Sequence, residues 1–97
     1  MSWSNDSRIA LELGVTMTDS NGEALFFDDT NEQVFGVEGP AAEALFLLRQ
    51  GKTLGEATAA LLETYDVERP VLMGDIVVVL DTMVEHRVLR AVARSAD

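Results

Sequence analysis

The pattern of apolar and polar positions changes its period at Gly39-Pro40. Before this point the apolar residues alternate with polar ones or form short runs, which is typical of β-strands, and afterwards they repeat with helical spacing. The sequence therefore predicts three strands at residues 9–18, 23–28 and 33–37, followed by three helices at 40–49, 54–65 and about 71–86. This order predicts an α+β domain with a three-stranded antiparallel sheet followed by three helices.

Turn and capping residues separate these elements. Asn21-Gly22 accepts positive φ angles and predicts a tight hairpin between the first two strands. Thr53 followed by Glu56 forms a capping box, which predicts that the second helix begins at Leu54. Residues 1–8 and 91–97 are predicted to be flexible tails. The apolar residues at 88–92 fit either a short helix or a strand.

The third strand is predicted to have an open edge beside the helices. An edge strand carries unpaired N–H and C=O groups, to which another peptide can pair. Gly36 lies inside this strand, where glycine often marks the close approach of another backbone; a bulge or crowding against a helix is the alternative explanation. The candidate binding residues on this strand are Gln33, Val34, Phe35, Gly36 and Val37.

The third helix carries more apolar surface than one core-facing stripe requires. Its core stripe consists of Leu72, Ile76, Val79, Leu80 and Met83. Val71 and Val78 lie on a flank outside the stripe, which indicates either a deeply buried helix or the wall of a groove. Asp75 lies early in the helix, where the helix dipole favours a carboxylate, and it could also meet a basic or hydroxyl group of a ligand. The candidate groove wall is Val71, Asp75, Val78, Val79 and Thr82.

Composition and charge narrow the function. A chain of 97 residues predicts one domain, and without cysteine it has neither disulfides nor a thiolate site. The net charge is −10, and residues 1–48 hold nine acidic residues against the single basic residue Arg8. Such a surface repels phosphate backbones and anionic lipids, so it indicates either simple solubility or attraction of a basic partner. No segment resembles a membrane span or a signal peptide, and the predicted location is the cytoplasm.

The sequence lacks a recognisable set of catalytic groups. His86 is the only histidine and lies at the end of the third helix, where a protonated imidazole would complement the helix dipole. There is no two-histidine metal site, no P-loop and no dinucleotide-binding fingerprint. We therefore expect no enzymatic activity, no metal and no cofactor.

A winged-helix DNA-binding regulator is the strongest alternative, with the second and third helices as the DNA-reading pair. A DNA-reading helix exposes Arg, Lys, Asn or Gln in its N-terminal half, but residues 70–76 contain none of these. Together with the acidic charge, this predicts that the protein does not bind nucleic acid.

Several segments resemble the PqqD-like family, also called recognition elements of ribosomally synthesised and post-translationally modified peptides. The resemblance covers about residues 14–90, and the segments that carry it are 23–28, 34–38, 39–42, 51–53, 60–67, 75–81 and 88–89. An aromatic pair is common in the third strand of this family, where this chain has Val34-Phe35. An asparagine is common just after that strand, where this chain has Glu38.

The resemblance implies a winged-helix-like, peptide-binding domain over residues 9–90 that is not itself an enzyme. In this family the leader of a precursor peptide adds as a strand to the third strand and lies against the third helix. A radical SAM enzyme, cyclodehydratase or leader peptidase then acts on the peptide, as in PQQ and lasso-peptide biosynthesis. Two further possibilities remain open: an acidic adaptor that docks on an enzyme without touching its substrate, and a homodimer formed through the open edge.

Overall fold

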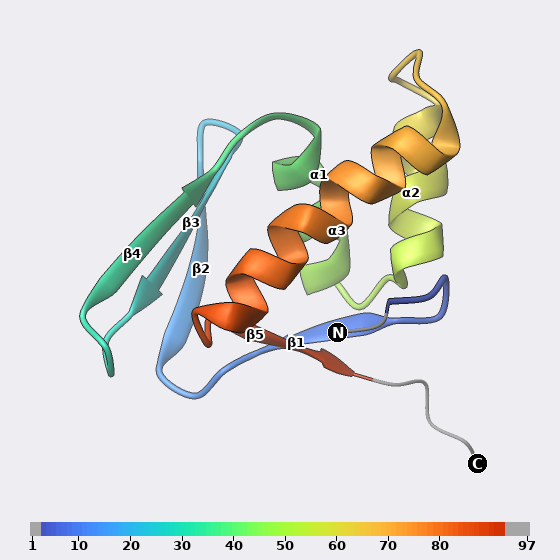
Figure 1. Ribbon diagram of the computed structural model, residues 1–97. Helices are drawn as coiled ribbons and strands as arrows, with labels where there is room; N and C mark the ends of the chain where they lie inside the picture. Colours follow the sequence, from blue (N-terminus) through green and yellow to red (C-terminus); the bar gives the residue numbers. More distant parts are fainter. Residues whose placement is uncertain (1–2, 93–97) are drawn as a thin grey trace.

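The computed structural model describes residues 3–92, which form five strands and three helices (Figure 1). In chain order they are β1 (Arg8–Leu11), β2 (Val15–Ser20), β3 (Glu23–Asp28), β4 (Gln33–Val37), α1 (Gly39–Arg49), α2 (Leu54–Leu62), α3 (Arg69–Glu85) and β5 (Leu89–Val92). The predicted α+β class, with a three-stranded antiparallel sheet followed by three helices, is confirmed.

The strands β2, β3 and β4 form the antiparallel sheet in that order. The β2–β3 turn is the predicted hairpin, with Asn21 and Gly22 at φ angles of 55° and 91°. In the β3–β4 register Phe26 pairs with Phe35 and Phe27 pairs with Val34. Phe26 is fully buried while Phe27 is exposed, so one face of the sheet packs on the core and the other faces outward.

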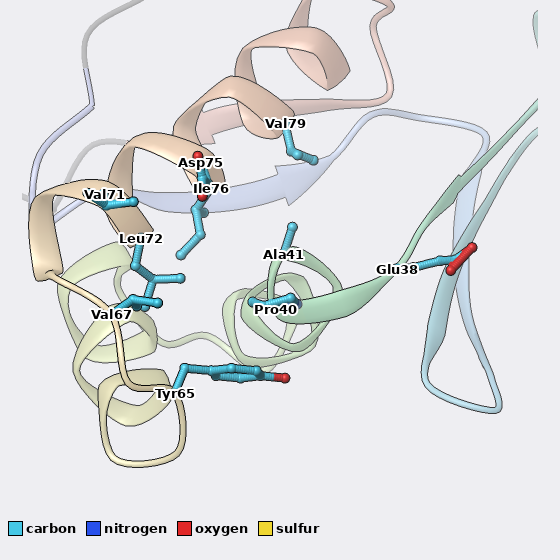
Figure 2. A pocket seen from close by; sticks show the side chains of 10 residues that line it. All are labelled: Glu38, Pro40, Ala41, Tyr65, Val67, Val71, Leu72, Asp75, Ile76 and Val79. Atoms are coloured by element: carbon cyan, nitrogen blue, oxygen red, sulfur yellow. The ribbon is translucent and has the colours of Figure 1, made fainter.

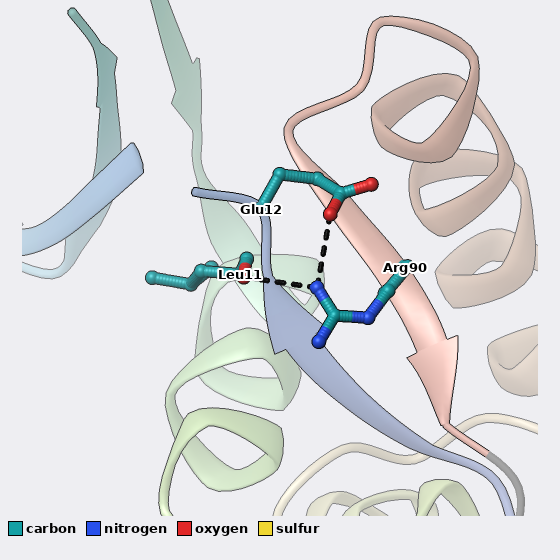
Figure 3. Close-up of polar contacts among 3 residues, drawn as sticks. All are labelled: Leu11, Glu12 and Arg90. Atoms are coloured by element: carbon teal, nitrogen blue, oxygen red, sulfur yellow. Dashed lines mark hydrogen bonds and ion pairs between the residues drawn. The ribbon is translucent and has the colours of Figure 1, made fainter. Parts of the chain in front are cut away.

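The predicted first strand, residues 9–18, is wrong as a single element. It is divided into β1 and β2, which belong to different sheets, and β1 pairs with β5 instead. Gly14 makes the corner with a φ of +87°, and its carbonyl accepts a hydrogen bond from the Asp29 N–H at 3.1 Å. Figure 3 shows how Arg90 of β5 reaches Glu12 at 2.9 Å and the Leu11 carbonyl at 3.4 Å just before this corner.

The N-terminal segment is not a loose tail from Trp3 onward. The first N–H groups of a helix have no partner within the helix. In α2 the first two are satisfied from this segment, because Leu54 N–H donates to the Ser7 carbonyl at 2.8 Å and Gly55 N–H to the Asn5 carbonyl at 2.9 Å. The Trp3 indole N–H donates to Asp81 of α3 at 2.7 Å. The predicted flexible tail over residues 1–8 is therefore wrong from Trp3 onward. Two of these three contacts are made by backbone carbonyl groups, which the side-chain pattern of the sequence does not show.

The C-terminal boundary also differs from the prediction. Residues 91–92 belong to β5, so the strand alternative for 88–92 is the correct one. The predicted tail over 93–97 lies outside the described residues.

Helix α1 packs on β3 at the inner face of the β2–β3–β4 sheet and α3 packs on β5, while α2 packs on α1 and α3, on the side away from that sheet (Figure 1). The largest fully buried side chains come from every layer: Phe26, Leu45, Leu48, Leu54, Ile76, Leu80 and Leu89. The predicted capping box is present, with Thr53 accepting from Glu56 N–H and the Glu56 carboxylate accepting from Thr53 N–H. The second helix ends at Leu62 rather than at the predicted residue 65, which leaves Tyr65 in the connection to α3.

Candidate functional site

Strand β4 is an edge of the sheet. Within residues 3–92 it pairs with β3 on one side only, as the sequence predicted. Its side chains alternate, so that Phe35 and Val37 are half-buried against the core whereas Val34 is 64% exposed on the outer face. The five candidate residues of this strand therefore divide between two faces, and they share an open main-chain edge.

The turn before β4 is held by a buried carboxylate. Asp28 accepts hydrogen bonds from the N–H groups of Thr30 and Asn31 at 3.1 Å each and from the Asn31 amide at 2.8 Å. The Gln33 amide also donates to it, at 3.4 Å. The Asn31 side chain is the largest cause that lowers the pKa of Asp28. The Gln33 side chain thus helps to fix the start of the strand.

The candidate wall on α3 is exposed. Val71 and Val78 are 57% and 65% exposed, while Leu72, Ile76 and Leu80 are buried beside them. A deeply buried helix is therefore excluded as the reason for the extra apolar surface. Asp75 is also exposed. The Thr82 hydroxyl, likewise exposed, donates back to the Val78 carbonyl at 3.0 Å.

A cavity of about 210 Å³ lies where the first half of α3 faces the start of α1 (Figure 2). Its lining is mainly apolar: Pro40, Ala41, Tyr65, Val67, Val71, Leu72, Ile76 and Val79, with Glu38 and Asp75 as the two acidic members. Figure 2 shows the side chains of α3 on one side and Pro40 and Ala41 on another, with the Tyr65 ring beneath them. The cavity is larger than the roughly 150 Å³ that holds a benzene molecule in an engineered protein core, so it has room for a large apolar side chain.

Three predicted site residues, Val71, Asp75 and Val79, line this cavity, whereas Val78, Thr82 and the β4 residues do not. Tyr65 was not predicted as a lining residue, because its helical spacing placed it at the end of the second helix. The Tyr65 hydroxyl donates to the Glu43 carboxylate of α1, and this hydrogen bond raises the pKa of Tyr65. The bond fixes the ring at the bottom of the cavity.

The side chains of Glu23 and Leu25, both on β3, lie beside Gly36 in the sheet. A Cβ atom added there would lie 2.6 Å from Glu23 Oε2 and 3.4 Å from Leu25 Cδ2. The register is regular across Gly36, so there is no bulge, and the nearest atoms belong to β3 rather than to a helix, so both alternative explanations are wrong. The close approach of another backbone stays a prediction.

In the described part of the chain, metal-binding side chains do not gather around this site. Across residues 3–92, no set of three or more His, Cys, Asp or Glu side chains is placed to hold a metal ion. None of the helices in that range combines the length and apolar character that crossing a bilayer requires. An open edge strand, an exposed apolar helix flank and a nearby apolar cavity are features that bind an extended peptide.

These features define a small α+β domain with an open sheet edge beside an exposed helix flank, and the sequence shows its family. The chain belongs to the PqqD family, because residues 23–89 match the model of coenzyme PQQ synthesis protein D (PqqD). No curated protein sequence matches the chain.

Two solved structures share the fold with a TM-score of 0.77 each. TbiB1 in complex with the TbiA(beta) leader peptide is 21% identical, and the match covers 87% of this chain and 98% of that one. Lasso peptide synthetase B1 complexed with the leader peptide is 17% identical, with 86% and 98% covered. Both of these structures are complexes with leader peptides.

Proposed function

We propose that this protein is a non-catalytic recognition protein that binds the leader of a ribosomally synthesised precursor peptide. The leader adds as a strand to the open edge of β4 and lies against the flank of α3 formed by Val71, Asp75, Val78, Val79 and Thr82. The observation that carries the proposal is the unpaired edge of β4 beside that exposed apolar flank. Family membership and the leader-peptide complexes of two similarly folded proteins support it.

Strand addition accounts for both halves of the site. Main-chain hydrogen bonds to the edge of β4 provide affinity for any extended peptide, whereas the side chains of the leader provide specificity through pockets. The apolar flank of α3 loses exposed surface on binding, at about 25 cal/mol for each Å² of apolar surface removed from water. The cavity between α3 and α1 accepts one apolar side chain of the leader.

A second partner completes the proposal. A protein without catalytic groups affects a reaction only by binding, so the bound leader is presented to a separate enzyme. That partner is a modifying enzyme, such as a radical SAM enzyme or a cyclodehydratase, or a leader peptidase. We place the protein in the cytoplasm, where precursor peptides are made.

A fluorescence-polarisation titration tests the proposal with a labelled precursor peptide chosen from the genes that neighbour the gene of this protein. The unmodified protein is expected to bind it at micromolar concentrations. Val78→Asp is expected to weaken binding at least tenfold, because it puts a charge on the apolar flank. The matched control is Leu13→Asp, which places the same charge on a 95% exposed leucine before β2, at the opposite edge of the sheet.

The other candidate functions predict different results. A DNA-binding regulator would bind a labelled DNA duplex with strong salt dependence. An adaptor that does not touch the substrate would bind no leader, and Val78→Asp would leave its docking on the enzyme unchanged. No leader binding at tens of micromolar would refute the proposed function.

A further inference from the structure

The carboxylate of Glu23 lies across the outer face of the open edge strand. Gly36 pairs with Leu25 in the β3–β4 register, and Glu23 lies two residues before Leu25 on the same face. Its Oε2 atom is 2.6 Å from the position that a Cβ atom of Gly36 would occupy. Because Gly36 has no side chain, the carboxylate reaches over β4 toward the unpaired edge.

This carboxylate has no partner of opposite charge in the described structure. Its side chain makes no hydrogen bond or ion pair within residues 3–92, although Glu23 is partly buried. Glu38 and Glu43 line a shallow hollow together with Glu23 and the β2–β3 turn, and that lining contains no lysine or arginine. The surface beside this end of β4 is therefore negative and uncompensated.

A strand added to β4 brings one side chain into this space. Residues directly opposite each other on neighbouring strands have Cβ atoms about 4.5–5.5 Å apart and point to the same face. The residue opposite Gly36 therefore points to the outer face, and a long side chain there can cross the bare backbone of Gly36 toward Leu25 and Glu23 on β3. Lysine and arginine fit such a place, because the aliphatic stem covers apolar surface while the charged group reaches the carboxylate.

We propose that the bound leader carries a lysine or arginine opposite Gly36, and that Glu23 binds its cationic group. This inference rests on the strand addition proposed above and names the chemistry that selects the leader. An acidic residue at the same position is rejected, since two carboxylates that meet above Gly36 repel each other. A second copy of this chain does not satisfy the site, because its own β4, residues 33–37, contains no basic residue.

The first test uses the labelled precursor peptide of the previous section. Glu23→Gln keeps the shape of the side chain and removes its charge. It is expected to weaken binding by about three- to tenfold, a range between an exposed and a partly desolvated ion pair. The control is Glu63→Gln at the exposed end of α2, which changes the net charge equally and is expected to leave binding unchanged.

The second test locates the partner residue on the leader. Each lysine or arginine of the leader is replaced in turn by glutamate, and every variant is titrated against the unmodified protein and against Glu23→Lys. Glu23→Lys is expected to restore binding of the leader variant that carries glutamate at one position only. A double-mutant cycle at that position measures the coupling energy between Glu23 and the leader residue.

The outcomes separate the two proposals. Binding that is unaffected by Glu23→Gln, or a charge reversal that restores no position, would overturn the role of Glu23 while leaving strand addition in place. Failure of the unmodified protein to bind the leader would overturn strand addition itself, and this inference with it.

Discussion

The ring of Phe35 lies against the imidazole of His86, with centroids 5.2 Å apart and planes tilted by 48°. Phe35 belongs to the edge strand β4, and His86 is the residue that ends α3. The contact therefore joins the two walls of the proposed leader site at one end. At the other end β4 runs directly into α1 through Glu38, which lines the cavity beneath α3.

Phe35 and Val34 are neighbours on β4 that point to opposite faces, and they form a matched pair for mutation. Phe35→Ala is expected to lower the free energy of unfolding by about 2 kcal/mol, less than for a fully buried phenylalanine, because the ring packs on the core and on His86. It should also weaken leader binding by loosening the joined walls. Val34→Ala, on the exposed face, is expected to change stability by less than about 1 kcal/mol. Urea denaturation measures the free energy of unfolding of both variants. Equal losses of stability would contradict the assignment of Phe35 to the inner face and Val34 to the outer face.

Asp28 makes stability depend on pH. Its carboxylate is 2% exposed and accepts four hydrogen bonds, and the Asn31 side chain contributes most to lowering its pKa below the ordinary value of 3.8. Because the folded pKa is lower than the unfolded one, the stabilisation is present above pH 3.8 and is lost as the pH falls toward the folded pKa.

The Asp28→Asn variant tests this dependence. It is expected to be less stable than the unmodified protein at neutral pH, because an amide cannot accept all four hydrogen bonds. The difference should shrink in acid, where the unmodified carboxylate is protonated. Urea midpoints measured from neutral pH to below 3.8 would show it, and a constant difference would contradict the prediction.

Trp3 provides a built-in reporter for the N-terminal segment, since it is the only tryptophan. Asp81→Ala removes the acceptor of its indole N–H, and is expected to shift the tryptophan emission and lower the free energy of unfolding by about 1–2 kcal/mol. Leader binding should not change, because Asp81 is not part of the proposed leader flank of α3. Asp75→Ala is the control on the same helix, and it should leave the emission of the free protein unchanged.

Two glycines with opposite surroundings predict opposite effects of alanine. Gly14→Ala is expected to destabilise the protein, because the new Cβ would lie 2.4 Å from Thr30 Oγ1 and the φ of +87° disfavours any L side chain. Gly74→Ala is expected to raise the free energy of unfolding by about 0.5–1 kcal/mol, because Gly74 is helical and nothing lies within 4 Å of the new Cβ. Thermal unfolding of both variants checks the signs.

Local signals predicted much of the fold. The bounds of β3 and β4, the Asn21-Gly22 hairpin and the capping box at Thr53 agree with the structure. The division at Gly14 was not predicted, because apolar residues alternate on both sides of it and the period does not show a corner. The β1–β5 pair and the anchoring of Trp3 were missed because their partners lie far along the chain.

Sequence patterns likewise predicted only part of the candidate site. The exposed valines of α3 and the edge of β4 follow from helical and strand periods, so they could be named from sequence. The cavity includes Pro40, Tyr65 and Val67, which come from separate elements and share no pattern. Crowding of Gly36 against a helix was one predicted alternative, whereas the structure places the Glu23 side chain of β3 beside it, which no local pattern shows.

The sequence by itself determined the order of strands and helices, the acidic charge and the absence of a recognisable catalytic motif, because these depend on residue type and on short-range spacing. Only the tertiary structure decided that β1 pairs with β5, which residues line the cavity and where the Glu23 carboxylate lies. These properties depend on burial and on pairing between distant segments, and both arise only when the chain packs.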